Sequence, residues 1–189
     1  MVSEAEMGWL AGIIDGEGTI VLFVGFRKGG KLNTASPQVI IGNTEKVMIE
    51  KVADIYGRLG VGVHIYHHEP KSACGVPGRV LSKYKTMYHA SVVGFQRTQK
   101  LLTVISPYLI TVKRQKAEAV LRFIEQRGKK IFKDGKFRCG QFQGSKYDID
   151  DLTMIRDIVA SGSRSKKLPL IEGLLRDYTQ ARDAQPRMI

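Results

Sequence analysis

The spacing of hydrophobic positions switches between two periods along the first part of the chain. Met48, Val52, Ile55 and Leu59 lie three or four residues apart, the spacing of one buried helix face. Residues 19–27 are instead rich in β-branched and aromatic side chains, which favours a strand. Segments with turn residues separate such stretches. The pattern predicts, in order, a helix over residues 3–14, strands over 19–27 and 34–41, a helix capped by Asn43 or Thr44 and ended near Gly57 and Gly60, strands over 61–68 and 83–93, and helices over 94–105 and 113–126.

Alternation within these segments assigns one face of each strand to a core. The residues expected to face inward are Pro37, Val39, Ile41, Val63, Ile65, Tyr84, Thr86, Tyr88, Ala90 and Val92, with Ala117, Val120, Leu121 and Ile124 on the last helix. The residues expected to face outward are Thr34, Ser36, Gln38, His64, Tyr66, His68, Lys83, Lys85, Met87, His89 and Ser91, with Val21, Phe23 and Gly25 on the first strand.

The chain beyond residue 126 has a different character. Residues 127–138 hold six basic side chains and a predicted hairpin turn at Asp134-Gly135. Helices are expected over residues 149–160 and 168–182, with the basic run 164–167 between them. We therefore predict a core domain over residues 1–126 and a basic, helical extension over 127–189 packed on the same domain.

The first predicted helix carries the most distinctive chemistry. Ser3 and Glu6 have the spacing of a capping box, and Gly16 and Gly18 are expected to end the helix. The helix ends in an Asp-Gly-Glu-Gly sequence, so its last turn holds two carboxylates, Asp15 and Glu17. A helix C-terminus is already partly negative, so this placement favours a nearby cation such as a hard divalent metal. The alternative is an ordinary buried helix with a solvated acidic turn.

The run Leu10-Ala11-Gly12-Ile13-Ile14-Asp15-Gly16-Glu17-Gly18 resembles the signature of the LAGLIDADG homing endonucleases, with Ile for Leu, Gly for Ala and Glu for Asp. The resemblance implies an α+β fold of order αββαββα, in which a four-stranded antiparallel sheet forms a DNA-binding saddle. Because the motif occurs once, it also implies a homodimer. The implied activity is Mg²⁺-dependent, site-specific cleavage of both strands of a long pseudo-palindromic DNA, leaving 3′ overhangs, by a protein encoded in an intron or intein. Ca²⁺ or Mn²⁺ could replace Mg²⁺ for binding.

The same resemblance implies roles for individual residues. Glu17 would bind metal from each subunit, assisted by the Gly16 carbonyl. Asp15 is a further metal candidate, although its place on the helix ridge also suits a structural or interface role. Lys113 matches a lysine placed near the scissile phosphate, although it could be a surface lysine at a helix start. Asn43 and Lys46 are candidates for a peripheral part of the catalytic site, where Gly42 departs from the family's polar side chain. The helix–helix interface of the dimer would use Gly8, Ala11, Gly12 and Asp15, which share one ridge.

The net charge of +12 and pI near 9.8 favour a polyanionic partner. The predicted DNA contacts are Arg27, Lys28, Lys31, Thr34, Ser36, Gln38, His64, Tyr66, His68, Lys71, Arg79, Lys83, Lys85 and His89. Each of them could equally be a plain solvated side chain. Double-stranded DNA is the expected partner and intron RNA a further one, since a maturase or a non-cleaving RNA-binding protein would also be basic.

Several classes are disfavoured by what the sequence lacks. No run of about 18 apolar residues and no signal-peptide pattern is present, so we expect a soluble intracellular protein without membrane association. Cys74 and Cys139 lack metal-ligand spacing and are expected to be free thiols, although a bridge is conceivable in a hyperthermophile. The histidines likewise lack a zinc-site frame.

Overall fold

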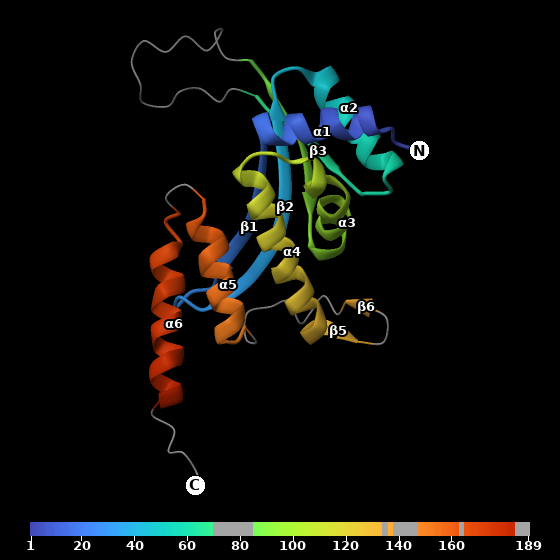
Figure 1. The fold of residues 1–189 in the computed structure, drawn as a ribbon. Helices are drawn as coiled ribbons and strands as arrows, with labels where there is room; N and C mark the ends of the chain where they lie inside the picture. Colours follow the sequence, from blue (N-terminus) through green and yellow to red (C-terminus); the bar gives the residue numbers. More distant parts are fainter. Residues whose placement is uncertain (70–84, 134–135, 138–146, 163–164, 184–189) are drawn as a thin grey trace, which may run out of the picture. The chain divides into compact units, whose positions relative to one another are not determined.

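A computed structural model describes residues 1–69, 85–133, 136–137, 147–162 and 165–183. Its elements run α1, β1, β2, α2, β3, β4, α3 (Figure 1), which confirms the αββαββα order predicted from the sequence. The described chain divides into two compact units, Met1–Ile20 with Gln38–Arg114 and Val21–Pro37 with Gln115–Ile189. Each unit is described by itself below.

Helix α1 spans Glu4–Glu17 and begins with the predicted capping box. Ser3 accepts a hydrogen bond from the Glu6 backbone, and the Glu6 carboxylate accepts one from the Ser3 N–H at 3.0 Å. The helix runs through Gly16 and ends at Gly18, whose N–H donates to the carbonyls of Ile13 and Ile14. The prediction that Gly16 helps to end the helix was therefore wrong. A Cβ on Gly18 would lie 2.7 Å from the Ile14 carbonyl oxygen, so close approach of the backbone requires glycine there.

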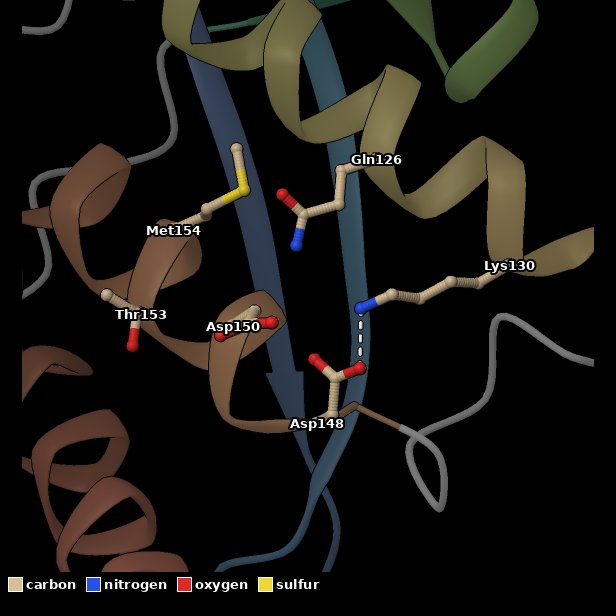
Figure 2. Close-up of a pocket in the computed structure, with 6 residues that line it drawn as sticks. All are labelled: Gln126, Lys130, Asp148, Asp150, Thr153 and Met154. Atoms are coloured by element: carbon tan, nitrogen blue, oxygen red, sulfur yellow. Dashed lines mark hydrogen bonds and ion pairs between the residues drawn. The ribbon is translucent and has the colours of Figure 1, made fainter.

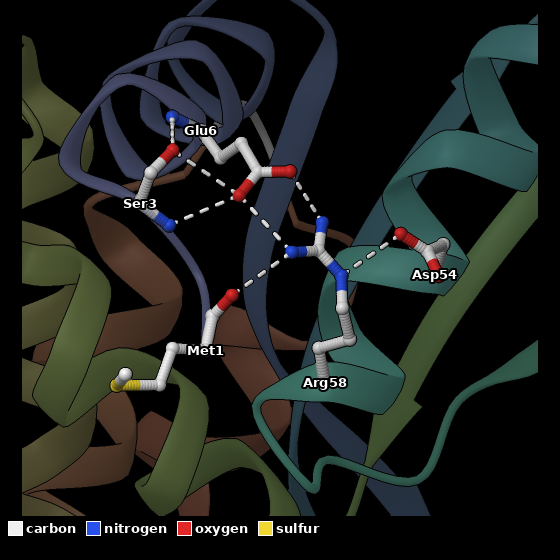
Figure 3. A network of polar contacts seen from close by, with 5 residues as sticks. All are labelled: Met1, Ser3, Glu6, Asp54 and Arg58. Atoms are coloured by element: carbon white, nitrogen blue, oxygen red, sulfur yellow. Dashed lines mark hydrogen bonds and ion pairs between the residues drawn. The ribbon is translucent and has the colours of Figure 1, made fainter.

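Glu6 also ties the start of α1 to helix α2, Lys46–Arg58 (Figure 3). The Arg58 guanidinium donates to both Glu6 oxygens, to the Met1 carbonyl at 3.2 Å and to Asp54 at 3.0 Å. The hydrogen bond from Arg58, then that from the Ser3 backbone, lowers the pKa of Glu6 to about 2. This network fixes the N-terminal half of α1 against α2.

The four strands are β1 Gly18–Phe26, β2 Leu32–Asn43, β3 His64–His68 and β4 Met87–Val93, in the sheet order β1-β2-β4-β3. Strand β4 pairs antiparallel with β2 and with β3, in registers that place Gly42 and Tyr66 on either side of His89. The expected core residues Val39, Ile41, Ala90 and Val92 are all fully buried. The predicted inward face is therefore confirmed at these four positions of β2 and β4, while Tyr88 is half-buried.

Strand β3 departs from its prediction. It begins at His64 rather than residue 61, and Ile65, expected in the core, is 55% exposed. All five residues of β3, which lies at one edge of the sheet, are exposed. The central strand β4 departs from its prediction in the opposite direction, because Ser91 was expected to be exposed on the outward face but is buried.

Local interactions and backbone geometry mark where the helices of the first unit begin. Helix α2 begins after Glu45 without a side-chain cap, so the predicted cap by Asn43 or Thr44 was wrong. Instead, Asn43 Oδ1 accepts the Glu45 N–H at 2.8 Å in a local turn. Helix α3, Phe95–Ile105, starts after Gly94 at φ 95° and is followed by the 3-10 turn η2, Ser106–Tyr108, which contains the proline.

The second unit contains helix α4, Val112–Ile131, from Gln115 onward, together with α5, Ile149–Ala160, and α6, Leu168–Asp183. Of these, α5 and α6 lie side by side (Figure 1). Of the predicted inward residues of α4, Leu121 is only half-buried, and Phe123 is buried instead. The short strands β5, Phe132–Lys133, and β6, Lys136–Phe137, pair as the predicted hairpin requires, while its turn residues lie outside the described chain. The domain boundary at residue 126 stays a prediction.

A buried ion pair organises the second unit. Arg127 on α4 donates to Asp151 on α5 at 2.7 Å, and both side chains are almost completely enclosed. The Arg127 guanidinium also lies 4.4 Å from the ring of Tyr147, whose hydroxyl accepts the Ala35 N–H at 2.9 Å. Asp148 and Asp151 form a capping box at the start of α5, which the sequence prediction missed.

Candidate metal and nucleic-acid site

The C-terminal end of α1 presents one unengaged carboxylate. Glu17 is the last residue of the helix and is exposed. Among the described residues its carboxylate has no hydrogen-bond or ion-pair partner, whereas Glu6 at the other end of the helix has several. Glu17 is thus available for a cation or a ligand from outside the chain.

Lys113 supplies a positive charge at the same helix end. Its Nζ donates to the carbonyl oxygens of Ile14 at 2.8 Å and Asp15 at 2.7 Å. Helix α1 has no basic residue in its own last turn, so Lys113 from the start of α4 compensates the negative end of the helix. An ammonium group has three N–H donors, and these two bonds leave one of them for another acceptor.

Asp15 has both carboxylate oxygens engaged within the chain. Oδ2 accepts the Ile110 N–H at 2.9 Å, and Oδ1 accepts the Thr111 hydroxyl at 2.5 Å. Thr111 Oγ1 in turn accepts the Lys113 N–H at 3.2 Å. Burial raises the pKa of Asp15, but hydrogen bonds from Ile110 and Thr111 and the charge of Lys113 outweigh it, so the net pKa is lowered. Asp15 therefore clamps Ile110 and Thr111, which precede α4. The sequence prediction assigned no role to either residue.

The donor chemistry at this helix end suits a hard divalent cation, but one chain has too few ligands. A carboxylate oxygen and helix-end carbonyl oxygens are the ligands that Mg²⁺ and Ca²⁺ prefer. Within the part of the chain that the structure describes, no three His, Cys, Asp or Glu side chains converge on one point. Glu17 is the ligand with free capacity, while Asp15 is already used in the clamp. The assignments of Glu17, Gly16 and Asp15 to a metal stay predictions.

Asn43 and Lys46, the candidates for the peripheral part of the catalytic site, interact with residues close to them in the sequence. The Asn43 side chain makes the turn described above, and Lys46 forms an exposed ion pair with Glu50 at 2.8 Å. That pair raises the pKa of Lys46, so the lysine keeps its charge. Both side chains belong to the unit that contains Glu17 and Lys113, and their catalytic role stays a prediction.

The predicted interface ridge of α1 is open on two of its four positions. Gly8 and Gly12 are exposed, and an added Cβ at either would meet nothing within 4 Å. Ala11 is buried within the chain, and Asp15 is half-buried in its clamp. Within the described part of one chain, these glycines are thus not needed for packing.

The predicted DNA contacts of the first unit gather on β3 and β4. His64, Tyr66 and His68 are exposed, His89 is half-buried beside them, and Gln38 is half-buried on β2. His64 Nε2 lies 3.1 Å from the Arg97 guanidinium. Lys85 is exposed and 3.6 Å from Glu45. Lys71, Arg79 and Lys83, like Cys74 and Cys139, lie outside the described residues.

The contacts predicted in the second unit surround the β1–β2 turn. Lys28 and Lys31 are exposed beside Gly29 and Gly30, whose φ values of 88° and 74° confirm the predicted turn. Arg27 donates to Asn33 at 2.7 Å across that turn. Thr34 and Ser36 are half-buried on β2.

Lys167, which precedes α6 in the basic run 164–167, was not among the predicted DNA contacts. Its Nζ donates to the Val24 carbonyl and lies 4.4 Å from the centroid of the exposed Phe23 ring. The outward face of β1, which was expected to be apolar, therefore carries a positive charge at Phe23. No spacing in the sequence connects residue 167 with residue 23.

A separate surface hollow of about 570 Å³ lies between α4 and α5 (Figure 2). Lys130 reaches Asp148 across it and bonds Asp151 at 3.1 Å. Asp148 is thus paired within the second unit, and the hollow holds none of the predicted site residues. The lining residues are Gln126, Lys130, Asp148, Asp150, Thr153 and Met154.

Comparison with known proteins identifies the family. The sequence profile of the LAGLIDADG-like domain matches residues 4–128, and the chain belongs to this family. The structure resembles the homing endonuclease I-CvuI, solved in complex with its target in the presence of Ca, at 20% identity, covering 94% of both chains with a TM-score of 0.60.

Two further solved structures share the fold. The archaeal intron-encoded homing endonuclease I-Vdi141I, complexed with DNA, has 16% identity over 94% of this chain and 98% of its own, with a TM-score of 0.57. The homing endonuclease I-TnaI has 13% identity over 91% and 97%, also with a TM-score of 0.57. No curated protein matches the sequence. In the described part of the chain no helix is long and apolar enough to cross a bilayer.

Proposed function

We propose that this protein is a site-specific DNA endonuclease that acts as a homodimer with a divalent metal ion, Mg²⁺ in the cell. The observation that carries the proposal is the unengaged Glu17 carboxylate at the end of α1, next to the carbonyls that Lys113 caps. The membership of the LAGLIDADG-like family and the shared fold with structures of DNA-bound homing endonucleases support it.

A second copy of the chain completes the proposed site. Packing two α1 helices in parallel along the open positions of Gly8 and Gly12 would bring the two Glu17 carboxylates together. Two carboxylates with adjoining backbone carbonyls would supply the oxygen ligands that the described residues of one chain lack. The metal bound there would activate a water and stabilise charge at phosphorus.

The side chains of each chain then have distinct roles in phosphodiester hydrolysis. Glu17 holds the metal, and Lys113 directs its remaining N–H at the phosphate, where it stabilises the developing negative charge. Asp15 is a positioning residue, because it fixes Thr111 and Ile110 and thereby the start of α4. Exposed residues of the β1–β2 turn, together with the face of β3 and β4 that carries His64, Tyr66, His68 and His89, bind the DNA backbone and base edges.

Cleavage of a randomised double-stranded DNA library with Mg²⁺ tests the proposal. We expect cuts at one long pseudo-palindromic sequence, with end sequencing showing 3′ overhangs. A folded protein that retains RNA in a filter-binding assay but enriches no DNA cut would contradict the proposal and favour an RNA-binding role.

A further inference from the structure

Three residues of neighbouring strands form a small ring cluster on the sheet. His89 in the central strand β4 is in register with Gly42 on β2 and with Tyr66 on β3. The His89 and Tyr66 rings are stacked, with centroids 4.8 Å apart and an interplanar angle of 14°. His68 meets the His89 ring edge-on at 5.3 Å. The imidazole is therefore held in place by aromatic contacts on the β3 side.

Gly42 makes room for this ring on the other side. A Cβ at residue 42 would lie 2.9 Å from His89 Nδ1 and 3.0 Å from its Cε1, closer than such atoms pack. The absence of a side chain thus lets the imidazole lie against β2. Gly42 is also the position at which the sequence departs from the polar residue expected for the family.

The environment of the two imidazole nitrogens differs, which fixes the tautomer. His89 Nδ1 is buried and makes no hydrogen bond within the described chain, whereas Nε2 is not enclosed. Burial, and then the nearby His68, lowers the pKa of His89, which favours the neutral ring. Orphaned buried N–H groups are rarer than unsatisfied acceptors, so the single proton belongs on Nε2.

We propose that His89 is a specificity-determining residue that donates a hydrogen bond from Nε2 to a base edge in the major groove of double-stranded DNA. Gly42 and Tyr66 are positioning residues that set the direction of this donor. The inference rests on the proposed function, because it requires that the outward face of β3 and β4 binds DNA.

The chemistry of the donor predicts which base it rejects. In the major groove, guanine and adenine present N7 as an acceptor and thymine presents O4, whereas cytosine presents only an amino donor. A neutral His89 with its proton on Nε2 would face donor against donor at cytosine. We therefore expect one position in each half-site at which cytosine is disfavoured by up to about tenfold, the range of one net hydrogen bond.

The test compares binding-site profiles selected from a randomised double-stranded DNA library in Ca²⁺. His89→Phe keeps a ring to stack on Tyr66 but has no donor, and His89→Ala removes the ring as well. Both should lose discrimination against cytosine at one position of each half-site and retain the other preferences. Gly42→Ala, which displaces the ring, should lose the same preference.

Matched substitutions separate this effect from general damage. His67→Ala removes an exposed histidine from the opposite face of β3, and Gly57→Ala adds a Cβ in α2 that meets nothing within 4 Å. Both should leave the profile unchanged. An enriched site with the same profile for wild type and His89→Phe would overturn this inference alone. Failure of the wild-type protein to enrich any sequence would overturn the proposed function and this inference with it.

Discussion

At the scale of single residues, the site depends on how Thr111 connects Asp15 to Lys113. The Thr111 hydroxyl donates to Asp15 and accepts from the Lys113 backbone, so it links the last turn of α1 to the first turn of α4. Ile110 adds a backbone N–H to the same carboxylate. The exposed Glu17 and the Lys113 ammonium are both set on the elements that this clamp joins.

Replacing Thr111 with valine should weaken the clamp without changing side-chain shape. We expect Thr111→Val to lower the free energy of unfolding by about 1 kcal/mol, the net value of one hydrogen bond. Cleavage should fall mainly in kcat, because Lys113 is displaced while the DNA-binding strands are untouched. Thr111→Ser, which restores the hydroxyl, should recover both quantities. Urea unfolding and single-turnover cleavage would measure them, and equal losses in the two variants would contradict the role of the hydroxyl.

The lowered pKa of Glu6 predicts how the free energy of unfolding changes with pH. Because its folded pKa of about 2 lies below the ordinary value of 4.5, its contribution to stability is present above pH 4.5 and is lost as pH falls toward 2. Glu6→Gln should therefore flatten the decline of unfolding free energy in that window. Glu4→Gln, an exposed substitution on the same helix turn, should leave the decline unchanged in the same unfolding series. Identical pH profiles for wild type and Glu6→Gln would refute the contribution.

At the scale of elements, the stability of the second unit depends on the buried ion pair between Arg127 and Asp151. Arg127 joins α4 to Asp151 of α5, and removing one partner would leave the other charge buried. Asp151→Asn should lower the unfolding free energy by about 3–5 kcal/mol.

The same helix provides a control for Asp151→Asn. Arg156 and Asp157 form an exposed ion pair of equal length, 2.7 Å, on α5. Asp157→Asn should change stability by less than about 1 kcal/mol, since water screens such pairs. Guanidinium unfolding of both variants would measure the difference, and similar losses would show that burial does not govern these pairs.

A substitution of Gly12 in helix α1 tests dimer formation. Gly12 has open space around it within the chain, so Gly12→Ala should stabilise one folded chain by up to about 1 kcal/mol. The proposed close approach of two helices would be lost, however, and sedimentation equilibrium should show a monomer. Gly57→Ala on α2 also meets open space and should leave the dimer intact. A dimeric Gly12→Ala protein would place the interface elsewhere.

At the scale of the whole molecule, the net charge of +12 predicts salt-dependent DNA binding. Lys28 is exposed in the β1–β2 turn and is expected to contact phosphate. Lys28→Ala should weaken binding to all sequences alike and reduce the slope of log K against log salt by about 1. Lys129→Ala, which removes an exposed lysine paired with Glu125 on α4, should keep the wild-type slope. A Lys28→Ala slope equal to that of wild type would argue against a phosphate contact.

The order of elements could be predicted from the sequence because periodicity and capping are local properties. Helix α5 was predicted residue for residue, and the Ser3 capping box starts α1 as expected. The exposure of Ile65 and the burial of Ser91 could not be predicted, because they depend on which segments cover each face of the sheet after folding. Pairwise order in a sheet is set by contacts between distant segments.

The candidate site was likewise predictable where it depends on local sequence and not where it depends on contacts between distant residues. The family motif placed Glu17 at the end of α1, and the segment resembling the family pointed to Lys113. The clamp of Asp15 by Ile110 and the contact of Lys167 with Phe23 join residues that are far apart in the sequence. No local pattern marks them, because a backbone N–H and a lysine ammonium become site features only after folding.

The most direct measurement of the central claim is cleavage of the selected DNA site by Glu17→Gln and by Glu4→Gln, each with Mg²⁺ and with a chelator. Glu17→Gln keeps the size of the side chain and removes its charge at the end of α1, and Glu4→Gln does the same at the other end of the helix. We predict that Glu17→Gln binds the DNA as a dimer without cutting it, that Glu4→Gln cuts like wild type, and that the chelator stops all cleavage. Retained cleavage by Glu17→Gln would contradict a metal site built on this carboxylate.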